Sequence, residues 1–168
     1  HQLAADDGLR RDADGACVPN RDVLLASAYI SYIGPFTKSF RDEILSTEFL
    51  PFLQKAAGGE SVPMSPTCDA LKILTNEATI AKWNTFGLPS DRVSSENGTL
   101  VTCSARWPLM IDPQLQGIAW IRDMLSSKNL VIKRLAHTDI VRKLKECLQD
   151  GTPMLIENMG ESIDAVLW

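Results

Sequence analysis

The sequence predicts an α/β fold in which a parallel sheet, with helices on both faces, follows a helical N-terminal half. Three short apolar segments alternate with helical patterns in the last third of the chain: Trp107–Asp112, Leu130–Leu135 and Pro153–Glu157. None of the three alternates polar with apolar residues, which is typical of strands covered on both faces. Two helices between three such strands imply right-handed crossovers and parallel pairing.

The rest of the chain divides by composition. Residues 1–20 are small and polar, and predict a flexible arm or linker. Residues 21–168 are predicted to form one module. Within it, residues 21–105 are mainly helical, and residues 106–168 run strand, helix, strand, helix, strand.

Capping residues and breakers set the predicted helix limits. Apolar residues recur at helical spacing before Gly34-Pro35, which predicts a first helix that ends there: Leu25, Ala28, Tyr29, Tyr32 and Ile33. The pattern of residues 90–103 is turn-like and partly extended. The predicted N-caps of the other helices are Thr37, Ser46, Ser65, Asn76 and Thr138.

Composition excludes several functions. The net charge of −4 and the scattered basic pairs argue against nucleic-acid binding. The sequence contains no apolar stretch long enough to predict a membrane segment. Four cysteines without a C-x-x-C pair, and only two histidines, predict reduced thiols and no metal site. The sequon Asn97-Gly98-Thr99 matters only in a secreted chain.

The order of strands and helices is that of a P-loop NTPase, with a changed phosphate loop. The loop should follow the first strand, but the turn here has neither the Gly-x-x-x-x-Gly-Lys-Ser/Thr pattern nor a lysine. Its carboxylate would repel phosphate and its proline lacks an N–H, although any helix N-terminus attracts anions. The residues at this candidate cofactor-binding position are Asp112, Pro113, Gln114, Gln116, Gly117 and Ile118.

The third strand ends where an NTPase carries its metal-coordinating acids. Glu157 retains a carboxylate, but Asn158 cannot act as a general base. We therefore predict no catalytic residue in this module, and no cofactor of its own.

Several segments together resemble dynein heavy chain, and most closely the fifth AAA+ module of an axonemal motor ring, stopping after its third core strand. The string Arg106–Gln114 is the most specific of them. Where the family usually has glycine and alanine in the turn, this chain has Leu115 and Gly117. The segments that carry the resemblance are Asp22–Leu25, Tyr32–Thr37, Trp83–Asn84, Gly87–Asp91, Ser95–Gly98, Arg106–Gln114 and Pro153–Asn158.

The resemblance implies a role and partners. In dyneins the fifth module is regarded as lacking nucleotide turnover, while the parent motor is a Mg-ATP-dependent ATPase. The implied partners are the neighbouring AAA+ modules, the stalk and its buttress, and the microtubule indirectly through the parent motor. The implied location is the cytoplasm and cytoskeleton, in the axoneme of a cilium or flagellum.

Two alternatives stay open at this point. A regulatory module would bind ATP or ADP without hydrolysing it, and a free-standing small NTPase would need a lysine and a catalytic acid that the turn and third strand lack. A chain that stops after the third strand would also lack the remaining strands, an arginine finger and the helical lid. We expect such a half-domain to expose apolar surface and to self-associate.

Overall fold

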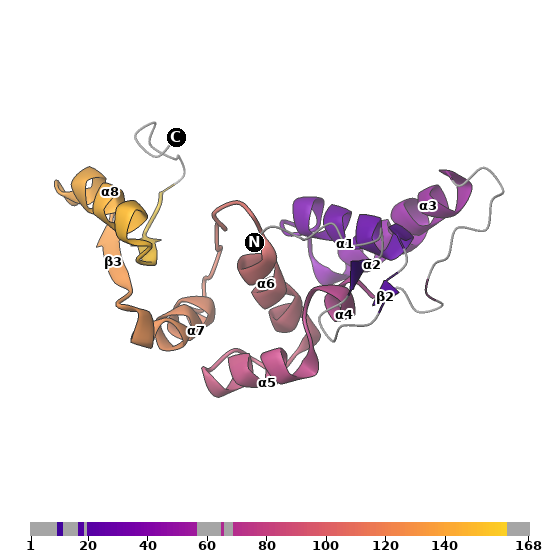
Figure 1. Ribbon diagram of the computed structural model, residues 1–168, viewed down its shortest axis with the longest axis horizontal. Helices are drawn as coiled ribbons and strands as arrows, with labels where there is room; N and C mark the ends of the chain where they lie inside the picture. Colours follow the sequence, from indigo (N-terminus) through magenta and orange to yellow (C-terminus); the bar gives the residue numbers. More distant parts are fainter. Residues whose placement is uncertain (1–9, 12–16, 19, 57–64, 66–68, 161–168) are drawn as a thin grey trace. The chain divides into compact units, whose positions relative to one another are not determined.

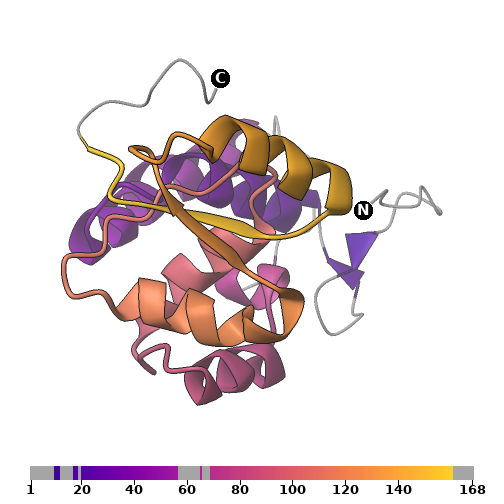
Figure 2. The same ribbon diagram turned by 90° about the vertical axis from the view of Figure 1, so that its left-hand side faces the viewer.

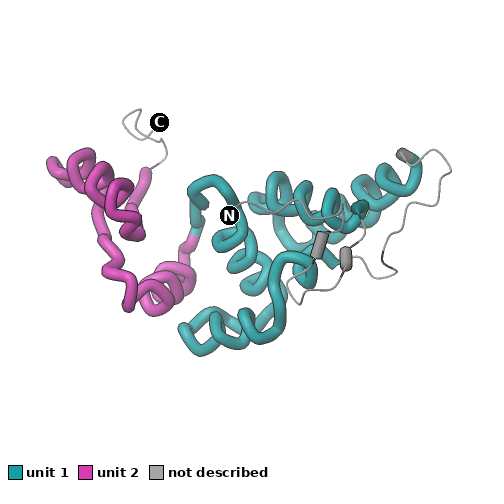
Figure 3. The backbone as a smooth tube through the Cα atoms, viewed as in Figure 1, with its two compact units in different colours: residues 1–111 teal, residues 112–168 magenta. Residues whose placement is uncertain are grey.

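The computed structural model describes residues 10–11, 17–18, 20–56, 65 and 69–160. The chain divides into two compact units, residues 1–111 and residues 112–168, drawn in teal and magenta (Figure 3). The predicted α/β class is confirmed: helices dominate, and one small parallel sheet is present in the described residues.

The described part of the first unit is helical apart from one short antiparallel ladder (Figure 1). That ladder, Arg10–Arg11 with Cys17–Val18, lies within the predicted arm. The elements of this unit are β1 (Arg10–Arg11), β2 (Cys17–Val18), α1 (Asn20–Tyr32), α2 (Lys38–Ile44), the π-helical segment η1 (Leu45–Phe49), α3 (Leu50–Ala56), α4 (Ala70–Leu74), α5 (Glu77–Thr85) and α6 (Arg92–Cys103).

Helix α1 supplies much of the first unit's core. Leu25, Tyr29 and Ile33, whose spacing predicted the helix, are buried. Ala26, Tyr29 and Ile33 form a cluster with Ala70 of α4. At the start of α1 the buried carboxylate of Asp22 accepts the backbone N–H of Ser65. The core therefore joins segments far apart in sequence.

Helices α2 and α3 form one continuous helical run, so the prediction of a separate third helix after Ser46 is wrong. The Ser46 hydroxyl donates to the Asp42 carbonyl and the Thr47 hydroxyl to the Glu43 carbonyl. Both hydroxyls bond back into the preceding turn instead of capping a new one. Pro51 has no N–H to donate, and the π-helical segment lies just before it.

Some of the predicted N-caps are confirmed and others are wrong. Asn76 caps α5 as predicted, its side chain accepting the Thr79 N–H at 2.9 Å. Asp69, and not Ser65, caps α4 by accepting the Leu71 N–H. The predicted first turn of that helix, at residues 66–68, lies outside the described residues. Thr37 precedes α2, but its side chain makes no capping bond.

The prediction that residues 90–103 are turn-like and partly extended is wrong, because Arg92–Cys103 form helix α6. Asp91 caps this helix by accepting the Ser94 N–H and hydroxyl. Its glycine, Gly98, lies close to Trp83 and Leu88, where a Cβ would be 3.1 Å from their side chains. Packing of this kind overrides the low helix propensity of serine, glycine and threonine.

The second unit contains a parallel pair of strands between helices. Strands β3 and β4 pair in parallel register, with Arg134 opposite Glu157, and α8 lies against β3 (Figure 2). Thr138 was predicted to cap α8, but Asp139 occupies that position and its side chain makes no cap bond. The elements are α7 (Gln116–Met124), the 3₁₀ turn η2 (Ser126–Lys128), β3 (Val131–Arg134), α8 (Ile140–Asp150) and β4 (Met154–Glu157).

The prediction of a first strand at residues 107–112 is wrong, because this segment is not a strand in the structure. Trp107, Leu109 and Ile111 are 71%, 66% and 90% exposed. A strand needs a neighbour that takes its backbone hydrogen bonds, and residues 107–112 pair with none of the described strands. The predicted three-stranded sheet is therefore two-stranded in the described residues.

Among the residues that the structure describes, no helix combines the length and apolar character that crossing a bilayer requires.

Candidate functional site

The turn before α7 is closed by its own carboxylate. Asp112 Oδ1 accepts the Gln116 N–H at 3.1 Å, and Asp112 Oδ2 accepts the Ile118 N–H at 2.9 Å. These are N–H groups of the first turn of the helix, which have no partner within the helix and in a phosphate loop point at the anion. The Asp112 carboxylate thus takes the hydrogen bonds of two N–H groups at the start of α7.

The residue before the helix has an unfavourable backbone conformation. Leu115 has φ 60° and ψ 21°, in the left-handed region. That region costs a residue with a Cβ about 1–2 kcal/mol, and glycine far less. The turn thus holds a residue with a Cβ in a conformation that glycine adopts at little cost.

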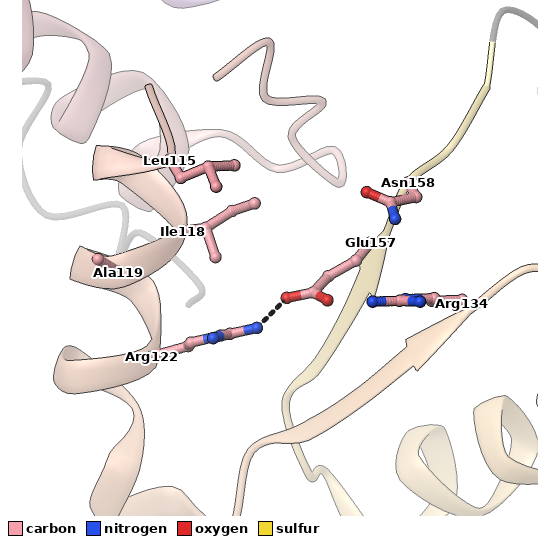
Figure 4. A pocket seen from close by; sticks show the side chains of 7 residues that line it. All are labelled: Leu115, Ile118, Ala119, Arg122, Arg134, Glu157 and Asn158. Carbon is pink, nitrogen blue, oxygen red and sulfur yellow. Dashed lines mark hydrogen bonds and ion pairs between the residues drawn. The ribbon is translucent and has the colours of Figure 1, made fainter. Parts of the chain in front are cut away.

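The acid at the end of the third predicted strand has a cationic partner. Glu157, at the end of β4, pairs with Arg122 of α7. Its side chain is 12% exposed, against 49% for that of Arg122. A free carboxylate here could coordinate a cation, but a guanidinium takes that place (Figure 4).

A pocket of about 360 Å³ lies between α7 and the end of β4. Asn158 stands at its edge with φ 53°, also left-handed. The α7 side carries three aliphatic residues and Arg122, and the strand side carries Arg134 and Glu157 (Figure 4). The lining residues are Leu115, Ile118, Ala119, Arg122, Arg134, Glu157 and Asn158.

The structure brings together only some of the predicted site residues. Ile118, Glu157 and Asn158 line the pocket. Gln116 and Gly117 form the start of α7, and Pro113 and Gln114 lie in the exposed turn before it. The predicted residues therefore form a helix cap and part of one pocket.

Sequence reasoning missed the other lining residues. Leu115, Ala119 and Arg122 follow one another at intervals of three and four, the spacing of one helix face, so helical periodicity could have found them. Arg134 could have been found from strand register, since it lies directly opposite Glu157.

No metal site is apparent in the part of the chain that the structure describes, where groups of three or more acids, cysteines or histidines at ligand spacing are absent. His137 accepts the Arg134 N–H at its own turn. Cys103 is exposed and Cys147 is buried, and both are free thiols.

A second polar cluster, in the first unit, joins two of the motifs that carry the resemblance. Arg41 is buried and donates to the carbonyl oxygens of Gly34 and Phe36 at 3.0 and 2.8 Å. It also donates to Glu96 Oε2 at 3.2 Å and Asn97 Oδ1 at 2.8 Å. Tyr32–Thr37 and Ser95–Gly98 thus meet at one guanidinium.

The same cluster continues to the start of α4. Arg92 bonds the other oxygen of Glu96 at 2.9 Å and pairs with Asp69 at 3.0 Å. Burial, together with the negative charge of Glu96, raises the pKa of the Tyr29 phenol. Every charged group in this Arg41 network has a partner, which indicates a structural role and not an open binding site.

Comparison with known proteins relates the chain to dynein motors. Residues 81–168, just over half of the chain, match the family described as the ATP-binding dynein motor region. Dynein axonemal heavy chain 11 of Sus scrofa is 44% identical, and the ciliary dynein beta chain of Heliocidaris crassispina 46%, each over 146 residues. The flagellar outer-arm dynein alpha chain of Chlamydomonas reinhardtii is 44% identical over 147 residues.

Each of these alignments covers 87% of this chain but 3% of the relative. The chain thus spans about 3% of the length of the curated relatives it matches. The resemblance seen in the sequence is confirmed at the level of axonemal dynein heavy chains, while its assignment to the fifth module stays a prediction. The chain belongs to the dynein heavy chain family, within the part described as the ATP-binding motor region.

Proposed function

We propose that this chain is a non-catalytic structural module of an axonemal dynein heavy chain, the fifth AAA+ module of the motor ring. The observation that carries the proposal is the Asp112 carboxylate, which accepts two N–H groups at the start of α7. A phosphate would have to displace this carboxylate and overcome its charge, with no lysine in residues 112–118 to compensate.

The acid side of the site supports the same proposal. Magnesium in an NTPase needs a free carboxylate and the phosphate oxygens of the nucleotide. Glu157 is paired with Arg122, and Asn158 supplies an amide that cannot take a proton from water. Hydrolysis would need a free carboxylate at Glu157 and a general base in place of Asn158.

The relatives supply the wider setting of the proposal. Their names place them in axonemes, cilia and flagella as heavy chains. We place this chain in the same cytoskeletal setting, within a motor that hydrolyses Mg-ATP at other modules and moves along microtubules. Its proposed partners are the neighbouring AAA+ modules, the stalk and the buttress, and its task is to hold their geometry.

A regulatory nucleotide-binding module is the second candidate. The family description includes ATP binding, and the pocket of about 360 Å³ adjoins the start of α7. That volume is at the small end of ligand pockets, which span about 300–1,000 Å³. This candidate requires Asp112 to swing away from the helix.

Thermal unfolding with and without Mg-ATP or Mg-ADP separates the two candidates. A ligand that binds only the native state at a hundredfold excess over its dissociation constant stabilises it by about 2.7 kcal/mol. The structural proposal expects unchanged melting in millimolar nucleotide. A reproducible upward shift, lost in Glu157→Gln, would favour the regulatory module.

A further inference from the structure

The pocket beside Glu157 contains a cation, Arg134, whose side chain has no partner among the residues that the structure describes. Arg122 is paired with Glu157, whereas the Arg134 side chain makes no hydrogen bond or ion pair with any described residue. Parallel register places Arg134 opposite Glu157, and its guanidinium is directed toward the space beside that carboxylate (Figure 4). The two arginines and one glutamate leave the pocket with one net positive charge.

Apart from the side-chain amide of Asn158, the rest of the pocket is aliphatic. Leu115, Ile118 and Ala119 form the α7 side, and Leu115 is 62% exposed. A ligand that fits must therefore place alkyl carbons against α7 and one negative charge at Arg134. A guanidinium presents a planar fork of donors that matches a carboxylate.

We propose that this pocket binds an acidic side chain, a glutamate or aspartate presented by another segment of the same long heavy chain. A carboxylate on a short alkyl stem matches both the single net charge and the aliphatic wall. A nucleoside triphosphate carries several negative charges and would face the Glu157 carboxylate. The inference rests on the proposed function, since a pocket that held nucleotide could not hold this side chain.

The source of the carboxylate follows from the setting of the chain. The relatives are heavy chains of which this sequence spans about 3%, so most of the polypeptide that could reach the pocket lies in other segments. The pocket is thus a contact point through which one part of a heavy chain engages another.

The test uses the 168-residue chain labelled with ¹⁵N at arginine and in the backbone. N-acetyl-glutamate N′-methylamide is titrated, with the glutamine derivative as the matched neutral probe. The expected result is a saturable shift of the Arg134 Nε–H signal, with a dissociation constant on the order of 1 mM. The neutral probe should leave that signal in place.

Arg106 provides the control, because it is an exposed arginine outside the pocket. Arg134→Gln should remove the response and Arg106→Gln should keep it. Equal shifts at both arginines in the wild-type chain, or none at Arg134, would overturn the inference without any variant having to fold. Shifts of the Gln116 and Ile118 amides with Mg-ATP would instead overturn the proposed function.

Discussion

Arg41 Nη1 and Glu96 Oε2 lie 3.2 Å apart although 55 residues separate them in sequence. Their side chains are only 4% and 5% exposed. The pair connects α2 to α6, and Arg41 also bonds the carbonyl oxygens of the loop between α1 and α2. A buried charge pair of this kind makes the helices of the first unit depend on one another.

Removing the buried cation should strongly destabilise the first unit. Arg41→Ala removes the guanidinium that bonds Glu96 and the carbonyl oxygens of Gly34 and Phe36. Among the described residues, Arg92 remains as the charged partner of Glu96. Breaking a buried pair in this way costs about 3–5 kcal/mol. Denaturant unfolding measures this loss of unfolding free energy. The control is Lys38→Ala at an exposed position of the same helix, which should change stability by about 0.5 kcal/mol or less. Equal losses in the two variants would contradict the structural role of Arg41.

Gly98→Ala should also destabilise the first unit. The new methyl group would lie 3.1 Å from both Trp83 and Leu88, which are 5% and 7% exposed and have little room to move. Overpacking costs about 1–3 kcal/mol, of which the better helix propensity of alanine returns about 1 kcal/mol. Gly34→Ala, whose nearest atom would be 3.8 Å away, is the matched control in a thermal melt. A stabilised Gly98→Ala variant would show that α6 packs differently.

Leu115→Gly should stabilise the second unit. Glycine removes a left-handed strain of about 1–2 kcal/mol, while its greater freedom in the unfolded chain costs about 0.5–1 kcal/mol. The exposed leucine side chain loses little on removal. Urea unfolding should therefore show a gain of about 0.5–1 kcal/mol. Leu115→Ala keeps the Cβ and should show no gain; if both variants lose stability equally, the strain at this turn has been misjudged.

The stability contributed by Asp91 should disappear in acid. Hydrogen bonds from the Ser94 hydroxyl and N–H lower the pKa of this carboxyl below its usual 3.8. Because the folded pKa lies below the unfolded value, the contribution is present above about pH 4 and is lost as pH falls through the folded pKa. The stability gap between wild type and Asp91→Asn, measured by denaturant unfolding, should narrow from about pH 6 to about pH 3. A gap that widens toward low pH would mean that the cap is not ionic.

The local signals in the sequence predicted the second unit best. Apolar periodicity located α7 and α8, and two apolar runs bounded by turn residues located β3 and β4 in parallel order. Residues 107–112 have the same apolar character and are not a strand, because strand formation depends on a neighbour and not on composition. The prediction of the N-cap was correct at Asn76 and wrong at Thr138. Thr138 is followed by a second polar residue, Asp139, and the sequence alone does not decide which of the two precedes the helix.

The Arg41 network and the pocket show what sequence reasoning could not reach. Arg41 lies in a helix with many polar residues and was indistinguishable from a solvated side chain until α6 was seen to pack nearby. Helix α6 itself was hidden because Ser95, Gly98 and Thr99 are weak helix formers that tertiary packing holds in place. The missing lysine and the presence of Asn158 could be read from the sequence, and they led to the prediction that phosphate chemistry is lost. The hydrogen bonds of Asp112 and the pairing of Glu157 with Arg122 required the structure.

We propose that the Asp112 carboxylate keeps phosphate from the start of α7. A titration of the chain with Mg-ATP, followed by the amide signals of Gln116 and Ile118, distinguishes a closed turn from an open one. Since both N–H groups donate to Asp112, we expect their signals to stay unchanged at millimolar nucleotide. Saturable shifts of these two amides would show that phosphate displaces the carboxylate and that the turn binds nucleotide.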